Sequence, residues 1–163
     1  MAIETTFITS GKSEKVPSGN TNHLFPVFLK LEEMNVLLVG AGNVGLEKLN
    51  AIISNAPATH VLVVAESISH EVELLAANYP NIKLIQKTFD ADDLDGMQVI
   101  IIAVNDKISS AVIRDEAKKK NILVNAADMP DICDFYLGSV VQKGNVKIAI
   151  STNGKSPTTA KRL

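Results

Sequence analysis

The residues best suited to chemistry form a glycine-rich stretch after the apolar run 36–39, and it reads Gly40-Ala41-Gly42-Asn43-Val44-Gly45. An amphipathic stretch over 43–54 follows, which is the context in which G-x-G-x-x-G binds a dinucleotide pyrophosphate. Gly40 permits a tight turn, Gly42 lets backbone amides approach the phosphates, and Gly45 allows close helix packing. The helix N-terminus adds positive potential. The predicted cofactor contacts here are Gly40, Gly42, Asn43, Val44 and Gly45.

Polar residues after two further apolar runs extend this predicted site. Glu66 follows the run 61–65 and could accept hydrogen bonds from ribose hydroxyls, while its charge would repel a 2'-phosphate. That favours NAD over NADP as cofactor, although Ser67 could equally occupy the ribose position. Asn105 and Asp106 follow the run 99–104, and we expect them both to line the nicotinamide side and to cap the next helix.

Asp128 is the candidate catalytic residue. It ends the stretch Asn125-Ala126-Ala127-Asp128 after the apolar run 122–124, at the edge where open α/β sheets bind ligands. There it could act as a general base beside the nicotinamide. The alternative is an aspartate that only caps a turn before Pro130.

Other apparent motifs carry no chemistry in their context. Tyr79 and Lys83 have the spacing of a dehydrogenase pair, but Pro80 and Asn81 break the helix that such a pair needs. The acidic run 90–95 lacks the ligand positions of a calcium loop. The three histidines lack metal-ligand spacing, so we expect no bound metal.

The elements that must position these residues alternate between β-rich runs and helical patterns, which is typical of repeated βα units. The predicted strands are 36–39, 61–65, 82–85, 99–104 and 122–124, and the predicted helices are 43–54, near 68–78 and 107–119. The fold class is therefore α/β, with a Rossmann-type doubly wound parallel sheet. Two further β-rich stretches, 138–142 and 146–152, predict a hairpin that is either a sheet extension or a dimerisation arm.

Length and composition restrict the partners. The chain has 163 residues, a formal charge of −2 and one cysteine, so it offers neither a broad basic face for nucleic acid nor an internal disulfide. No stretch resembles a signal peptide or spans a membrane. We therefore expect a cytoplasmic protein, a disordered tail over 1–22, and a homodimer formed through the apolar hairpin.

Five motifs together resemble the precorrin-2 dehydrogenase and sirohydrochlorin ferrochelatase family, the N-terminal region of sirohaem synthase. They occur in order as Leu24-Phe25-Pro26-Val27-Phe28, the glycine stretch with Lys48, Ala103-Val104-Asn105-Asp106, Asn125-Ala126-Ala127-Asp128, and Ala149-Ile150-Ser151-Thr152-Asn153-Gly154-Lys155-Ser156-Pro157. The resemblance covers residues 23–163.

The resemblance implies NAD-dependent oxidation of precorrin-2 to sirohydrochlorin, with insertion of Fe(II) in some members. Asp128 matches the family's aspartate linked to catalysis, and Thr152 matches a position near the tetrapyrrole. Lys155 and the helix start at Ser156 are expected to contact substrate carboxylates. The alternative is a non-catalytic NAD-sensing module, which would not explain the hairpin.

The resemblance also divides the chain into four parts. They are a tail over 1–22, an NAD-binding Rossmann domain over 23–134, a strand-rich dimerisation segment over 135–155, and over 156–163 the start of a truncated C-terminal helical domain.

Overall fold

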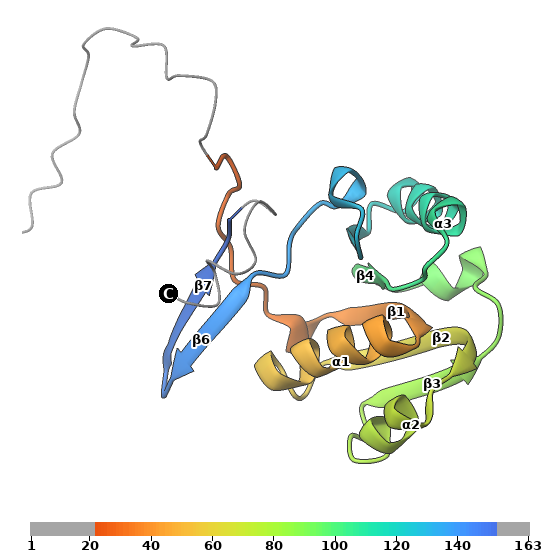
Figure 1. The fold of residues 1–163 in the computed structure, drawn as a ribbon, viewed down its shortest axis with the longest axis horizontal. Coiled ribbons are helices and arrows are strands. Elements are labelled where there is room, and N and C mark those ends of the chain that lie inside the picture. The colour runs from red at the N-terminus through yellow and green to blue at the C-terminus, as the bar shows by residue number, and fades with distance from the viewer. Residues whose placement is uncertain (1–21, 153–163) are drawn as a thin grey trace, which may run out of the picture.

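The computed structural model describes residues 22–152, and its centre is a sheet of five parallel strands (Figure 1). Their order is β3-β2-β1-β4-β5, which is the order of the doubly wound dinucleotide-binding fold. The strands are β1 Asn35–Ala41, β2 His60–Ile68, β3 Ile82–Gln86, β4 Val99–Ile102 and β5 Leu123–Ala126. The predicted fold class is confirmed. The expected tail and the expected helix at Ser156 fall outside the described residues, except for Asn22.

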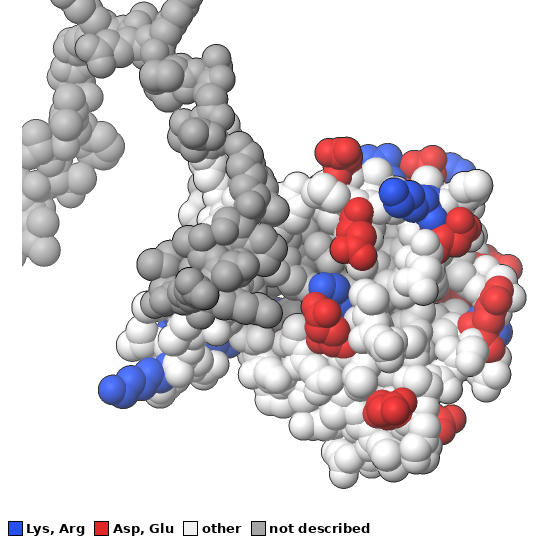
Figure 2. Space-filling model, viewed as in Figure 1, with Lys and Arg blue, Asp and Glu red and all other residues white. Residues whose placement is uncertain are grey.

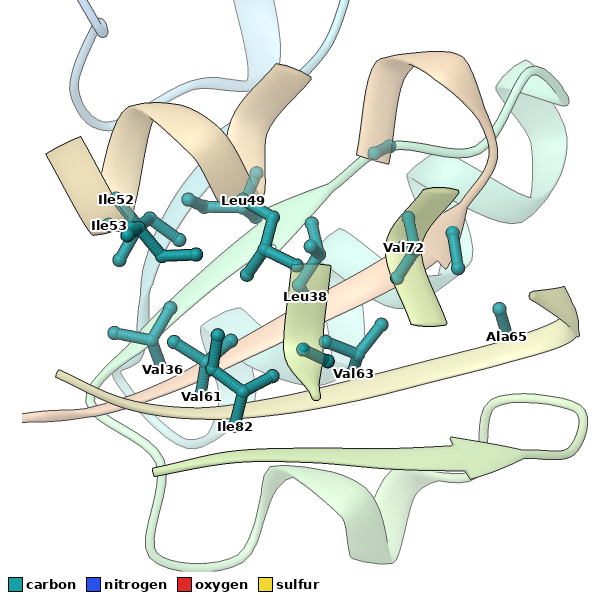
Figure 3. Packing of buried hydrophobic residues seen from close by; sticks show 14 of the residues in the cluster. Val36, Leu38, Leu49, Ile52, Ile53, Val61, Val63, Ala65, Val72 and Ile82 are labelled. Atoms are coloured by element: carbon teal, nitrogen blue, oxygen red, sulfur yellow. The ribbon is translucent and has the colours of Figure 1, made fainter. Parts of the chain in front are cut away.

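Helices cover both faces of the sheet. The α-helices are α1 Asn43–Asn55, α2 His70–Ala76 and α3 Lys107–Lys119, and the short 3-10 helices are η1 Leu31–Glu33, η2 Ala91–Leu94 and η3 Pro130–Ile132. Successive side chains of a strand point to opposite faces, so Val36 and Leu38 of β1 pack with α1 and α2 (Figure 3). Leu37 packs in a second cluster with residues of α3. Two apolar layers therefore fix the sheet between the helices.

Of the boundaries that differ from the sequence prediction, two bear on the candidate site. Strand β2 runs on to Ile68, because Ile68 pairs with Ala41 beyond an irregularity in the register, and α2 begins only at His70. Strand β4 ends at Ile102, so Ala103 and Val104 belong to the loop above the sheet. β2 is thus longer and β4 shorter than predicted, and both changes lie at the carboxyl edge of the sheet, where the candidate site is found.

The hairpin forms a separate antiparallel pair, β6 Ser139–Lys143 with β7 Val146–Ile150, beside residues 22–30 (Figure 1). Asn22 Nδ2 donates to the Ser151 carbonyl oxygen over 3.2 Å, and Lys147 Nζ donates to the Asn55 carbonyl oxygen over 3.2 Å. The predicted hairpin is confirmed. Its apolar side chains remain open in the single chain: Val141, Val146 and Ile148 are 52%, 63% and 54% exposed.

Charged side chains of both signs are intermixed on the visible face of the Rossmann unit, and basic side chains stand at the hairpin tip (Figure 2). Within residues 22–152, no helix is long and apolar enough to cross a membrane.

Candidate functional site

The glycine-rich turn joins β1 to α1, and two of its glycines are required by their surroundings. Gly40 has φ +103°, and a Cβ there would collide with the carbonyl oxygen of Ala103. A Cβ on Gly45 would collide with the carbonyl oxygen of Gly40. Because neither glycine has a Cβ, α1 can pack closely against β1, and β1 can pack closely against the residue that follows β4. This is the tight turn and close packing that the sequence predicted.

Gly42 is different, because a Cβ there would meet nothing within 4 Å. It faces a cavity of about 810 Å³ above the ends of β1, β2 and β4. Gly42 is also the N-cap of α1 and provides no side-chain cap, so the first amides of the helix are left to a ligand. An open backbone, a helix N-terminus and this volume fit a dinucleotide pyrophosphate.

The structure gathers most of the predicted cofactor residues around this cavity. From the turn, Gly40, Gly42, Asn43 and Val44 line it, whereas Gly45 lies behind the turn. From the neighbouring strand ends, Glu66, Ser67, Asn105 and Asp106 line it.

Glu66 is held in place by the end of β3. Its Oε1 accepts a hydrogen bond from Thr88 Oγ1 over 3.2 Å, and its carbonyl oxygen accepts one from Gln86 Nε2 over 3.0 Å. Lys87 lies between Gln86 and Thr88 in the sequence and also lines the cavity. Its Nζ is 2.7 Å from Asp93 Oδ1, and this hydrogen bond raises the pKa of Lys87 above its ordinary value. Sequence reasoning missed Lys87, because its pairing with Asp93 is a tertiary contact.

Asp106 caps α3, which is one of the two roles predicted for it. Its carboxylate accepts hydrogen bonds from Ser109 N over 2.8 Å, from Ser109 Oγ over 2.5 Å and from Ile108 N over 3.3 Å, so it caps α3. The hydrogen bonds from Ser109 lower the pKa of Asp106. The same residue lines the cavity beside Asn105.

Asp128 lies in a second cavity, of about 370 Å³, between the end of β5 and the start of the hairpin. Thr152, which the family resemblance places near the tetrapyrrole, lines the same cavity, while Lys155 and Ser156 lie outside the described residues. Asn105 and Asp128 therefore line different cavities. The two cavities are neighbours at the ends of β4 and β5. Ala127, which lines the second cavity, donates through its N–H to the carbonyl oxygen of Ile102 over 2.9 Å, and Ile102 precedes Ala103 of the first cavity.

Lys48 of α1 also lines the second cavity and is the only cation among the described residues that do so. Its side chain is 19% exposed, and its Nζ is 3.1 Å from Glu47 Oε1. A cation with this degree of burial, in a cavity with Asp128, is suited to bind an anionic group. Its position in the family motif was the available signal, but the sequence alone did not show that Lys48 lines the same cavity as Asp128.

The loop after Asp128 returns along the outer edge of β5. Cys133 Sγ accepts a hydrogen bond from Ala126 N over 3.1 Å and donates to the Ala126 carbonyl oxygen over 3.3 Å. Burial raises the pKa of Cys133. Asp134 accepts hydrogen bonds from Val124 N over 2.9 Å and from Lys118 Nζ over 2.7 Å.

The pKa of Asp134 reflects opposing effects. Burial raises this pKa, but the hydrogen bonds from Lys118 and from the Val124 amide outweigh burial and hold the net value below the ordinary one. The ionised carboxylate therefore stabilises the folded loop.

Metal ligands are not grouped in the described part of the chain. Across residues 22–152, no set of three or more His, Cys, Asp and Glu side chains is placed to hold a metal ion.

Comparison with known proteins agrees with this geometry. An NAD(P)-binding family model matches residues 27–139, and the model of the sirohaem biosynthesis protein central region matches residues 143–163. Siroheme synthase of Methylococcus capsulatus is 36% identical over 138 residues, and that of Psychrobacter cryohalolentis is 38% identical over 139. Each match covers 85% of this chain but only 28% and 26% of those relatives, so the chain spans little more than a quarter of their length.

A solved structure, "SirC, precorrin-2 dehydrogenase", superposes with a TM-score of 0.71 at 25% identity, over 85% of this chain and 67% of that one. The two family models together span the glycine-rich turn, the residues that line both cavities and strand β7 of the hairpin. The chain belongs to the NAD(P)-binding family that includes this region of the siroheme synthases.

Proposed function

We propose that the protein oxidises precorrin-2 to sirohydrochlorin with NAD, as a step of sirohaem biosynthesis. The observation that carries the proposal is the pairing of two neighbouring cavities, one at the glycine-rich turn and one containing Asp128. Dehydrogenation needs such a pair, because a hydride must pass from the substrate to a cofactor held beside it. The family membership and the resemblance to a precorrin-2 dehydrogenase support the choice of substrate.

The first cavity holds the cofactor in this proposal. The amides at the start of α1 bind the pyrophosphate beside Gly42, and Glu66 or Ser67 binds the adenosine ribose. Asn105 and Asp106, which follow β4 and line the cavity, contact the nicotinamide side of the cofactor in this proposal. When bound, NAD supplies the hydride acceptor.

The second cavity holds the reacting edge of the tetrapyrrole. Lys48 pairs with a substrate carboxylate, and Thr152 contributes further polar contacts, joined by Lys155 and Ser156 from the segment that follows. Asp128 accepts the proton that the substrate loses as its hydride leaves. Its φ of +57° lies in the left-handed region, so the backbone holds this aspartate in a conformation that asparagine and aspartate tolerate better than most residues.

An anaerobic absorbance assay tests the proposal. Protein, NAD and precorrin-2 are mixed, and NADH formation is followed together with the appearance of sirohydrochlorin. Equal rates of both are expected. NAD binding without either product would contradict the dehydrogenase function and favour a sensor. Addition of Fe(II) to the product mixture measures the separate ferrochelatase activity as sirohaem absorbance.

We further propose that the chain works as a cytoplasmic homodimer, with residues 23–134 as the NAD-binding domain and 135–155 as the dimerisation segment. The supporting observation is the open apolar face of the hairpin, next to an N-terminal segment in which Phe25 is 87% and Phe28 is 68% exposed. A second copy would remove this surface from water. Sedimentation at micromolar concentration should give twice the chain mass, and Ile148→Asp should give the monomer mass.

A further inference from the structure

The adenosine end of the first cavity contains one charged pair that the proposed reaction does not use. Lys87 is the only cation among the described residues that line this cavity. Lys87 N donates to the Ala65 carbonyl oxygen over 2.9 Å, which places Lys87 beside Glu66, the expected ribose acceptor. A cation at this position is what a 2'-phosphate of NADP would need. Whether Lys87 is already paired with a carboxylate therefore affects whether the cavity binds NAD or NADP.

Lys87 forms a salt bridge with a carboxylate that lies outside the cavity. Its Nζ lies 2.7 Å from Asp93 Oδ1, and the Asp93 side chain is only 8% exposed. Asp90 and Asp92 of the same acidic turn also act on the Lys87 charge. The positive charge of Lys87 is thus already compensated before any ligand binds.

Asp93 is itself fixed by the first turn of η2. Its Oδ2 accepts a hydrogen bond from Asp90 N over 2.9 Å, while Asp90 Oδ1 accepts one from Asp92 N over 2.9 Å. The turn is anchored by Leu94, which is buried at 1% exposure. The carboxylate of Asp93 cannot follow Lys87 toward a ligand without breaking this reciprocal cap.

We propose that Asp93 is a positioning residue for cofactor choice: it holds Lys87 and neutralises it, so that Glu66 dominates the adenosine end and NADP is rejected. The inference rests on the proposed function only in placing a nicotinamide dinucleotide in the first cavity. Without Asp93, Lys87 would be free to pair with a 2'-phosphate. In the native protein, the selectivity for NAD over NADP therefore depends on an ion pair between Lys87 and Asp93 that contacts neither the ribose nor a phosphate.

The test compares NAD and NADP affinities by isothermal titration calorimetry with the whole chain. For the native protein, NADP should bind at least about tenfold more weakly than NAD. Asp93→Asn retains one acceptor for the Asp90 amide but removes the charge, and it should lower the NADP-to-NAD ratio of dissociation constants about tenfold, which is about 1.4 kcal/mol. Adding Lys87→Met to Asp93→Asn should restore the native ratio.

Asp95→Asn is the matched control. Asp95 belongs to the same acidic loop, but it pairs with Lys120 Nζ at 2.5 Å and does not contact Lys87. The control removes the same charge, so an equal gain in NADP affinity would assign the effect to net charge and overturn the proposal. An unchanged ratio in Asp93→Asn, measured on folded protein, would also overturn it.

Lys87→Met keeps the proposal testable if Asp93→Asn does not fold. Lys87→Met removes the cation and leaves the Asp93 carboxylate charged, so the NADP-to-NAD ratio should stay at the native value or rise. A tenfold fall in the ratio would mean that Lys87 is not what a 2'-phosphate could use, and would refute the inference. These outcomes are distinct from failure of the proposed function, in which neither dinucleotide binds or binding is not followed by turnover.

Discussion

Gly42→Ala should separate cofactor binding from folding more cleanly than any other change in the glycine-rich turn. Gly42 has φ −88° and ψ −157°, which alanine adopts without left-handed strain, and a Cβ there meets nothing within 4 Å. The free energy of unfolding should therefore stay within about 1 kcal/mol of the native value. The new methyl group would instead occupy the space through which the pyrophosphate approaches the helix amides.

The expected loss of affinity follows from those amides. Each hydrogen bond to a charged group is worth about 1.5–3 kcal/mol, so losing one lowers NAD affinity about 10- to 100-fold. Calorimetric titration with NAD measures this loss, and urea denaturation measures stability. Native affinity in Gly42→Ala would refute the placement of the pyrophosphate at the turn.

Gly45→Ala is the matched control within the same turn. Helix propensity alone would favour alanine by about 0.8–1.0 kcal/mol. However, the Cβ would collide with the Gly40 carbonyl oxygen, and overpacking of this kind costs about 1–3 kcal/mol. Gly45→Ala should thus lower stability, or at best leave it unchanged, although it is the change that helix propensity favours. A clear stabilisation would show that α1 moves freely against β1.

Three further predictions concern the second cavity and its supporting loop. Asp128→Asn, which tolerates the φ of +57°, should reduce turnover about 100-fold or more while NAD affinity stays near native; unchanged turnover would remove Asp128 as the base. Lys48→Met should raise KM for precorrin-2 about tenfold through the lost carboxylate contact, with little change in NAD binding. Asp134→Asn should lower the free energy of unfolding at pH 7 by about 1–3 kcal/mol. Because the folded pKa of Asp134 lies below its ordinary value of 3.8, its stabilisation is present above that value and disappears as pH falls through the folded pKa. Urea denaturation should therefore show the difference between native and variant proteins shrinking as pH falls from about 4 through the folded pKa, and a constant difference would contradict this role.

The sequence predicted the fold well because its signals were local. Alternating apolar runs and the helix start at the glycine stretch depend on neighbouring residues, and the structure contains all five predicted strands in a doubly wound sheet. Strand ends were less certain, since the continuation of β2 to Ile68 depends on pairing with Ala41.

The site was predicted in part for the same reason. Four of the five predicted turn residues and Glu66 lie on consecutive elements and line one cavity, whereas Gly45 lies behind the turn. By contrast, the position of Asp128 in a separate cavity depends on how the loop after β5 meets the hairpin. Lys87 could not be recognised, because its partner Asp93 comes from a different element and is identified only by its distance.

The loop that returns along β5 has a consequence for self-association. β5 lies at one end of the sheet order, and an uncovered edge strand is a template for another chain. Here Cys133 and Asp134 occupy the hydrogen-bonding groups of Ala126 and Val124, so the loop acts as a substitute sixth strand. Detachment of this loop would leave the backbone groups of Ala126 and Val124 unpaired, so local opening here would expose the edge of the sheet to aggregation.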